Sequence, residues 1–274
     1  VTGNSEIIVL EQGYHGNTRN TIDASPYKHD GLGGKGAPHW VHKVPMPYLY
    51  RGKYRDPETA GVDYSNEVSR IIKDLEISGK KPSAFICESI LGCGGQVPLP
   101  YNFITNNYSV IRSAGGLCIA DEVQIGFGRV GSHFWGFESE NTSPDIITMG
   151  KSMGNGHPLS AVVTTKEIAQ KFDNGMEYFN SFGGNPVSCA VGRTVLKIIE
   201  REKLQENAYL VGRYLIEELN DLKIRHKLIG DVRGRGLFLG IELIRDYDKM
   251  IPAASEAEQI VNDMKEHGIL ISKD

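Results

Sequence analysis

The sequence predicts an α/β fold in which a mostly parallel sheet is covered by helices on both faces. The sequence contains short apolar runs that are bounded by turn residues. Between several of them lie segments with the spacing of an amphipathic helix, such as Val68, Ile71, Ile72 and Leu75. Runs that are apolar throughout are typical of strands buried on both faces. Strands that alternate with helices favour a parallel sheet. The predicted strands are Ile7 to Leu10, Trp40 to Val44, Ala84 to Cys87, Leu117 to Ala120, Ile146 to Met149 and Ser160 to Val163.

The sequence changes character near residue 200. Asn185 followed by Pro186 is typical of a helix start, with a capping residue and then proline at the first helical position. We expect that helix to reach about Lys203. The remaining elements should be a helix from about Gln205 to Leu222, a strand pair over 229–243 and a helix over 255–267. We therefore predict a large domain over residues 1–200 and a smaller domain over 201–274.

Composition excludes several classes of protein. Of the 274 residues, 40% are hydrophobic and 23% charged, so the chain can bury a core and is not a disordered tail. The net charge of −4 argues against a nucleic-acid-binding domain. No apolar run approaches the ~20 residues of a membrane helix. The four cysteines lack metal-ligand spacing, so we expect reduced thiols and a cytoplasmic location.

One predicted strand ends in two acidic residues. The segment Leu117 to Gly131 runs from an apolar strand into Asp121 and Glu122 and then into a glycine-rich turn. Ligands of open α/β sheets bind beyond the carboxyl ends of the strands. An isolated pair of this kind could equally cap a helix or face solvent, so it predicts a site only together with a second signal.

The second signal is a lysine at the end of the next strand. Lys151 follows the run Ile146 to Met149, and a partly desolvated lysine favours the neutral amine that binds an aldehyde. A lone lysine is more often a surface residue. However, Lys151 comes 30 residues after Asp121, which fits one strand–helix–strand step and neighbouring strand ends. Such an acid and such an amine are what pyridoxal phosphate chemistry needs.

Together these segments resemble the class III (subgroup II) aminotransferases, which are fold-type I pyridoxal phosphate enzymes. The family pattern extends over Ile119 to Gly156, and the likeness covers nearly the whole chain, from Gly13-Tyr-His-Gly16 to Val232-Arg-Gly-Arg-Gly-Leu237. The resemblance implies a seven-stranded type of sheet in a large domain and an α+β small domain, neither of them complete here. A Gly-Ser-x-x-Ala-Asn loop should precede residue 1, and a substrate arginine should follow residue 274.

The resemblance also implies roles for individual residues. Lys151 matches the lysine that binds the cofactor aldehyde, and Asp121 matches the partner of the pyridine nitrogen. Gln124 matches a residue near the ring hydroxyl. Tyr14 matches an aromatic residue that stacks on the ring, and its neighbour His15 has a less defined role. Judged alone, Tyr14 would be a half-buried core aromatic residue.

Ser181, in Ser-Phe-Gly-Gly-Asn-Pro186, matches a threonine that contacts the cofactor phosphate from the partner subunit. Serine keeps the hydroxyl donor, although a serine in such a segment is more often a turn or capping residue. The match implies a homodimer with its active site at the subunit interface.

Two segments depart from the commonest family pattern. Many members carry Glu-Pro-x-x-Gly-Glu-Gly, whereas this chain keeps the first acid, Glu88, and has Cys93 in place of the second. We count Glu88 among the candidate cofactor-binding residues. The second is Tyr50 to Arg55. Together with Cys-Gly-Gly-Gln96, Gly-Arg-Val-Gly-x-His-Phe-Trp135 and Gly-Met-Glu-Tyr-Phe-Asn180, it resembles the branch of phospho-lyases that act on ethanolamine phosphate or 5-phosphohydroxylysine. We interpret its basic side chains as ligands of a substrate phosphate, with a solvated basic loop as the alternative. These side chains are Arg51, Lys53 and Arg55.

The predicted function is therefore elimination of phosphate from a phosphorylated amine, with aldehyde, ammonia and phosphate as products. The alternative is an aminotransferase that passes an amino group to a 2-oxo acid such as pyruvate or glyoxylate. A protein that keeps the fold without chemistry is a third reading, which the retained Lys151 argues against. The mitochondrial matrix is an alternative location.

Other motifs are weak. Gly31 to Gly36 lacks the Gly-Lys-Ser/Thr of a phosphate loop. Gly234 to Gly240 runs into a strand-like segment and not into the helix of a dinucleotide site. The eight histidines show no ligand spacing, so no metal is expected.

Overall fold

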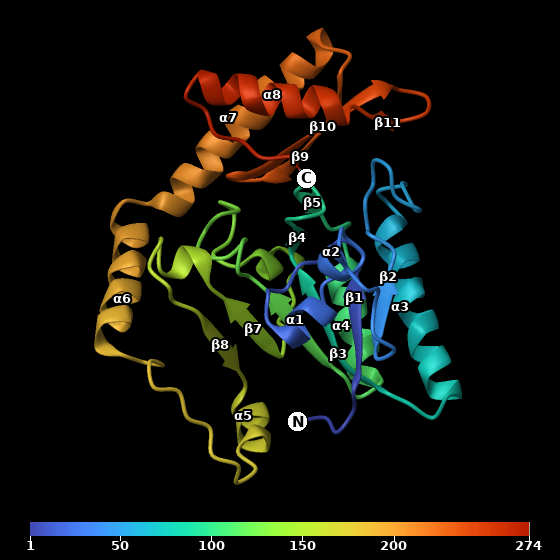
Figure 1. Cartoon of the computed structure of the whole chain (residues 1–274), viewed down its shortest axis with the longest axis vertical. Coiled ribbons are helices and arrows are strands. Elements are labelled where there is room, and N and C mark those ends of the chain that lie inside the picture. The colour runs from blue at the N-terminus through green and yellow to red at the C-terminus, as the bar shows by residue number, and fades with distance from the viewer. Residues whose placement is uncertain (274) are drawn as a thin grey trace.

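The computed structural model describes residues 1–273 and is built around a six-stranded sheet with the strand order β2-β1-β3-β6-β7-β8. All neighbouring strands run parallel except β8, which is antiparallel to β7. Figure 1 shows this sheet in the lower half of the molecule. Its strands are β1 (Glu6–Leu10), β2 (Val41–Val44), β3 (Pro82–Glu88), β6 (Leu117–Asp121), β7 (Ile146–Met149) and β8 (Ala161–Thr164).

Each of the six predicted apolar runs lies in one of these strands, with bounds that differ by at most a few residues. The prediction of a mostly parallel α/β sheet is confirmed. The exception at β8 has a simple cause: β7 reaches β8 through the short turn around Lys151, and a short connection favours an antiparallel neighbour.

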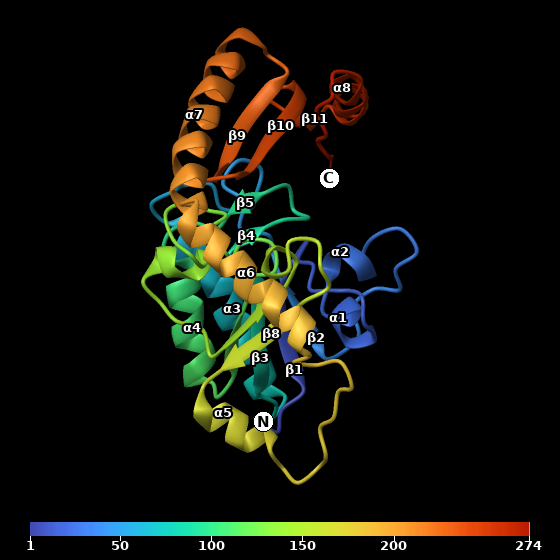
Figure 2. The ribbon, with the colours of Figure 1, turned by 90° about the vertical axis from the view of Figure 1, so that its left-hand side faces the viewer.

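Helices cover both faces of the sheet. On one face, α3 (Ala60–Ile77) and α4 (Phe103–Ser113) bury Val68, Ile72 and Ile111 against Phe85 of β3. On the other face, Ala24 at the end of α1 packs with Val9 and Val41. Figure 2 shows α1 and α2 (Pro26–His29) on the side of the sheet away from α4. Short elements complete this part: β4 (Ile90–Leu91), β5 (Val97–Pro98), α1 (Arg19–Asp23) and α5 (Lys166–Phe172).

The chain then leaves the large sheet through two long helices, α6 (Pro186–Arg201) and α7 (Leu204–Arg225). The Asn185 side chain caps α6 by accepting a hydrogen bond from the Ser188 backbone N–H at 2.9 Å, as predicted. Helix α7 packs on a second sheet, with the order β11-β10-β9, above the first one (Figure 1). We call this second sheet the small sheet. Its elements are β9 (Ile229–Arg235), β10 (Phe238–Asp246), β11 (Ile251–Pro252) and α8 (Ala254–Glu266).

The connection between β6 and β7 differs from the prediction. A strand–helix–strand step was expected, but the connection holds one short 3-10 helix, η1 (Gly136–Glu140). Gly128 and Gly131 have φ values of +78° and +75°, which interrupt a helix. Three aromatic rings pack edge to face in its place, with centroids 4.9–5.6 Å apart: Phe127, Phe134 and Trp135. The two strands are nevertheless neighbours, so the predicted consequence holds.

Gly61 sits where α3 meets the segment before α4. A Cβ added there would overlap the carbonyl oxygen of Tyr101. Alanine is otherwise the better helix former by about 1 kcal/mol. We predict that Gly61→Ala lowers stability by about 1–3 kcal/mol, because overpacking outweighs propensity. Urea unfolding of the intact protein measures the change. The neighbouring Val62 is 50% exposed, so Val62→Ala should shift stability by at most about 0.5 kcal/mol. Unchanged or raised stability of Gly61→Ala would contradict this packing.

Candidate active site

Three neighbouring strands bring acidic and basic side chains to one edge of the large sheet. Glu88 ends β3 and Asp121 ends β6, and the two residues are paired in register. Strand β7, beside β6, ends at Met149, two residues before Lys151. Because parallel strands end at the same edge, this edge corresponds to the ligand-binding edge of open α/β sheets.

Asp121 is a buried carboxylate with two donors. Its Oδ2 lies 2.8 Å from Nδ1 of His15, and its Oδ1 accepts a hydrogen bond from the Val123 backbone N–H at 3.1 Å. The side chains of Asp121 and His15 are only 6% and 1% exposed. Beside a carboxylate oxygen, Nδ1 acts as the donor. The sequence left the role of His15 undefined. In the structure, His15 orients Asp121.

Glu88 joins the same cluster. It accepts hydrogen bonds from the backbone N–H groups of Tyr14 and Gly92, both at 3.1 Å, and from Nε2 of Gln124 at 3.4 Å. Burial raises the pKa of Glu88, while the nearby His15 and these backbone donors oppose the rise. The structure therefore brings five of the predicted residues together, namely Tyr14, His15, Glu88, Asp121 and Gln124.

The Tyr14 ring is only partly buried. It packs edge to face on Tyr27, with centroids 5.9 Å apart, and the Lys28 ammonium lies 5.5 Å from its centroid. A ring held on one side in this way can present its other side to a flat ligand.

Lys151 begins a short 3-10 turn, η2 (Lys151–Met153), and its side chain is exposed. Within residues 1–273 the ammonium group makes no hydrogen bond or ion pair. It lines a cavity of about 810 Å³ together with Val123, Met149 and Ser160. Val123 is the residue whose N–H binds Asp121, so the cavity adjoins the carboxylate cluster.

Ser181 is not part of this cluster in a single chain. It is exposed, in a segment between α5 and α6 that lacks regular structure. Large apolar side chains around it are also exposed: Met176, Tyr178, Phe179 and Phe182 are each 77–82% accessible.

The three basic residues after β2 contact three different partners. Arg51 forms an ion pair with Glu242 of β10 at 2.5 Å, and Lys53 with Glu67 of α3 at 2.7 Å. Arg55 directs a guanidinium nitrogen to Sδ of Met250 at 3.6 Å. Arg51 shares Glu242 with Arg233 of β9, and Arg233 also donates to the Gly95 carbonyl oxygen in the turn after Glu88.

Sequence reasoning did not assign a role to Glu122. Its carboxylate is fully buried and accepts hydrogen bonds from the Ser89 hydroxyl at 2.6 Å and from the N–H groups of Gly136 and Phe137 at 2.8 and 3.1 Å. It thereby fastens η1 to the end of β6. The only sequence signal was its place beside Asp121 after a buried strand.

The donors and acceptors at this edge fit pyridoxal phosphate. A ring nitrogen needs a fixed carboxylate, which Asp121 could supply, and an aldehyde needs an amine without a competing partner, which Lys151 could supply. His15 Nε2 is buried and, within the described residues, has no hydrogen-bond partner. Residues 1–273 contain no group of three or more His, Cys, Asp or Glu side chains placed to hold a metal ion. No helix there is long and apolar enough to cross a membrane.

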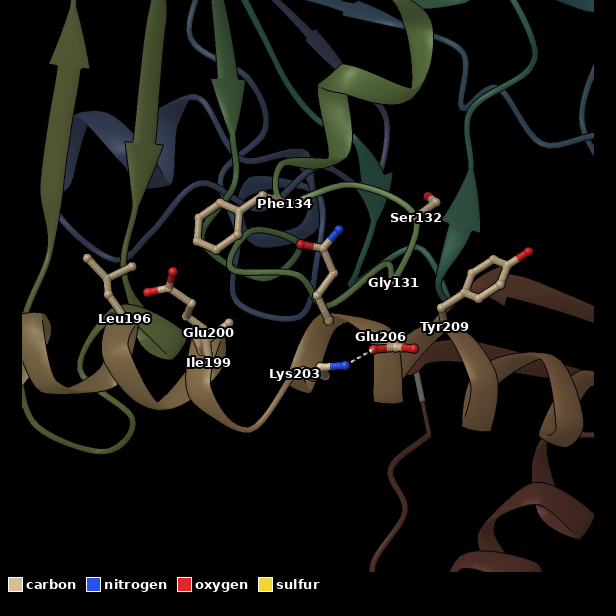
Figure 3. Close-up of a pocket in the computed structure, with 10 residues that line it drawn as sticks. Gly131, Ser132, Phe134, Leu196, Ile199, Glu200, Lys203, Glu206 and Tyr209 are labelled. Atoms are coloured by element: carbon tan, nitrogen blue, oxygen red, sulfur yellow. Dashed lines mark ion pairs between the residues drawn. The ribbon is translucent and has the colours of Figure 1, made fainter.

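A second cavity, of about 730 Å³, lies where the β6–β7 connection meets α6 and α7 (Figure 3). Phe134, Leu196, Ile199 and Tyr209 line it, and an ion pair between Lys203 and Glu206 at 3.6 Å crosses one side. None of the predicted cofactor or substrate residues lines this cavity.

The fold is that of the fold-type I pyridoxal phosphate enzymes, and the side chains at this edge fit that cofactor. The model of the family "Aminotransferase class-III" matches residues 1–273. The chain belongs to this family, as its motifs predicted. Class III aminotransferases use pyridoxal phosphate, so the predicted cofactor is confirmed.

Individual relatives differ in the activity that their names give. A Drosophila melanogaster protein named alanine–glyoxylate aminotransferase 2-like is 47% identical over 100% of this chain and 56% of its own length. Ethanolamine-phosphate phospho-lyase homolog 1 of Caenorhabditis elegans is 41% identical over 100% of this chain and 61% of its own. A solved phospholyase from Arthrobacter, in complex with phosphoethanolamine, has a TM-score of 0.91 and 36% identity, covering 99% of this chain and 64% of that one. This chain thus spans little more than half the length of the curated relatives.

Burial raises the pKa of Glu122, although three hydrogen bonds oppose the rise. A raised pKa means that the folded state holds the proton more tightly, so this residue's contribution to stability falls as pH rises from the ordinary carboxyl pKa through the folded one. Glutamine does not titrate and leaves one buried N–H without an acceptor, at about 1–3 kcal/mol. We predict that Glu122→Gln destabilises the protein more near pH ~4 than near pH ~8. Urea unfolding at both pH values tests this.

Glu256 provides the control, because its ion pair with Arg245 lowers its pKa to about 2. The loss of stability caused by Glu256→Gln should therefore stay the same or grow as pH rises, whereas the loss caused by Glu122→Gln should shrink. The same pH trend for both variants would contradict the assignment.

Proposed function

We propose that the protein is a pyridoxal phosphate-dependent phospho-lyase that eliminates phosphate from a small phosphorylated amine such as ethanolamine phosphate. The products are an aldehyde, ammonia and phosphate. The observation that carries this proposal is the basic loop after β2: Arg51 pairs with Glu242 of β10, and Arg233, which also pairs with Glu242, donates to the Gly95 carbonyl in the turn that follows Glu88. The absence of an acid at Cys93 and the similarity to the Arthrobacter phospholyase support it.

An aminotransferase is the second candidate, in which a 2-oxo acid such as pyruvate or glyoxylate receives the amino group. The observation that favours it is the 47% identity to a relative named as an alanine–glyoxylate aminotransferase. Both candidates use the same cofactor and the same lysine. In an aminotransferase, a proton would be returned to the cofactor. In a phospho-lyase, phosphate would leave the substrate.

Bound pyridoxal phosphate supplies an aldehyde that captures amines and a ring that delocalises negative charge. Lys151 would hold the cofactor through Nζ at its aldehyde. With a substrate amine in that place, Nζ would be the base that accepts the proton from the substrate carbon that bears the amine. In the lyase reaction, phosphate would leave from the adjacent carbon, and water would convert the remaining enamine to an aldehyde and ammonia.

Asp121 would hold a proton on the ring nitrogen through its carboxylate. The donors from His15 and Val123 keep that carboxylate oriented. Tyr14 would stack on one face of the ring. Gln124, which donates a hydrogen bond to Glu88, would contact the ring hydroxyl, and Glu88 fixes the Tyr14 backbone.

In our proposal, Arg51 binds the substrate phosphate, with Lys53 and Arg55 adding positive charge around it. Arg51 can turn toward a substrate without leaving Glu242 unpaired. Glu242 would keep a hydrogen bond from the Tyr48 hydroxyl at 2.9 Å and the ion pair with Arg233 at 3.1 Å. Arg51 is also the more accessible partner, at 35% exposed compared with 10% for Arg233.

We also propose a homodimer in which Ser181 binds the cofactor phosphate of the partner subunit. Exposed large apolar side chains on both sides of Ser181 in the sequence support this, because such side chains gather at interaction sites. The boundary between the two domains would lie near residue 200, at the end of α6. For location we propose the cytoplasm, because the four cysteines lack metal-ligand spacing and Cys87 and Cys118 are buried free thiols. The mitochondrial matrix is the alternative, because some relatives are named as mitochondrial.

The decisive assay compares two activities of the intact enzyme on phosphorylated amines. We expect phosphate and ammonia to be released in equal amounts, without need of a 2-oxo acid. Lys151→Ala should abolish release, since it removes the proton acceptor. Amino transfer that depends on a 2-oxo acid, without release of phosphate, would instead establish the second candidate.

The double variant Arg51→Ala/Lys53→Ala tests the phosphate site in the same assay. KM for the phosphorylated amine should rise about tenfold or more, because charge-assisted contacts to the phosphate are lost. Arg245→Ala removes an exposed arginine of β10 that pairs with Glu256 and should leave KM unchanged. Unaltered KM in the double variant would remove these residues from the site.

A further inference from the structure

The backbone at Lys151 is in an unfavourable conformation. Lys151 has a φ of +37° and Asn155 a φ of +44°. Both angles lie in the left-handed region, which residues other than glycine rarely adopt. Gly156 follows with a φ of +98°. Such conformations persist where the surrounding structure holds them, and they cluster at functional sites. The question is what holds this turn.

Backbone hydrogen bonds close the turn on itself. The Asn155 N–H binds the Lys151 carbonyl at 3.1 Å, and the His157 N–H binds the Gly154 carbonyl at 3.0 Å. These bonds fix the local shape. However, they join the turn to nothing outside it, so they do not determine where Lys151 points relative to the carboxylate cluster.

One side-chain contact joins the turn to a long helix. His157 Nε2 lies 2.8 Å from Oγ of Ser188 in the first turn of α6. Among the described residues, this is the side-chain hydrogen bond that links residues 151–157 to another element. Close packing accompanies it: a Cβ on Gly192 would come within 2.7 Å of Leu159, so the glycine lets α6 approach the turn.

The hydrogen bonds at the start of α6 also set the direction of this link. The Asn185 side-chain oxygen accepts from the Ser188 N–H, so its amide nitrogen faces Ser188 Oγ and donates to it at 2.9 Å. The Ser188 hydroxyl proton is then free to be donated to His157 Nε2. The Asn185 amide nitrogen also donates to the Phe182 carbonyl at 2.9 Å. One network thus ties the Lys151 turn to the segment that contains Ser181.

We infer that His157 is a positioning residue: through Ser188 and the start of α6 it holds the Lys151 turn so that the amine faces the cofactor site. His157 does not touch the reacting atoms. Its effect reaches the chemistry through the placement of Lys151 alone. Because the same network reaches Phe182, it also fixes the segment of Ser181 relative to Lys151. This inference rests on the proposed role of Lys151.

The test uses the intact enzyme and the variants His157→Ala, Ser188→Ala and both together. Without cofactor, amide hydrogen exchange over residues 151–157 should become about tenfold faster in each variant, since one hydrogen bond restrains the turn. The dissociation constant for added pyridoxal phosphate, read from its absorbance, should rise by a similar factor. The double variant should be no worse than either single variant, because both remove the same link.

Two further variants separate positioning from general stability. His157→Gln presents an amide at about the position of Nε2 and should restore most of the cofactor affinity. Thr194→Ala removes a side-chain hydrogen bond elsewhere in α6, from Oγ1 to the Ala190 carbonyl at 2.8 Å, and should alter neither measurement. Wild-type exchange and cofactor affinity in His157→Ala, or additive losses in the double variant, would overturn the inference. A wild-type enzyme that does not attach cofactor to Lys151 would instead refute the proposed function.

Discussion

The site depends on one buried contact, the 2.8 Å hydrogen bond between Asp121 and His15. An ionised carboxylate at the end of a buried strand is costly unless donors compensate for lost solvation. His15 and the Val123 N–H provide that compensation. Glu88, one strand away, keeps its own donors from Tyr14 and Gly92. Two carboxylates can thus lie side by side at the edge of the sheet.

The sheet explains why residues far apart in the sequence meet there. Glu88 and Asp121 end their strands, and Tyr14 and Lys151 follow the ends of two others. All four strands are parallel, and parallel strands end at a common edge. The small sheet stands beyond this edge. Its arginines reach back to the large domain, Arg233 to the Gly95 carbonyl and Arg235 to the Ser139 hydroxyl at 2.7 Å each. Substrate selectivity would arise where these two layers meet.

Much of this architecture could be predicted from the sequence. Buried strands are continuous apolar runs, and Asn185-Pro186 marked the start of α6 because capping is a local effect. The β6–β7 connection was harder to predict: glycines and three aromatic rings replaced the expected helix, a result of tertiary packing. For the site, motif resemblance identified Asp121, Glu88 and Tyr14 as candidates. It gave no role to Glu122 and did not single out His157, whose partners are distant in sequence.

The central claim is that Lys151 and Asp121 serve the same pyridoxal phosphate ring, and chemical trapping tests it most directly. Borohydride reduction of the intact enzyme with its cofactor, followed by peptide mass analysis, should place the cofactor on the peptide that contains Lys151. Asp121→Asn should retain that attachment but weaken cofactor binding and strongly reduce turnover. Attachment to a different lysine, or full turnover by Asp121→Asn, would contradict the account.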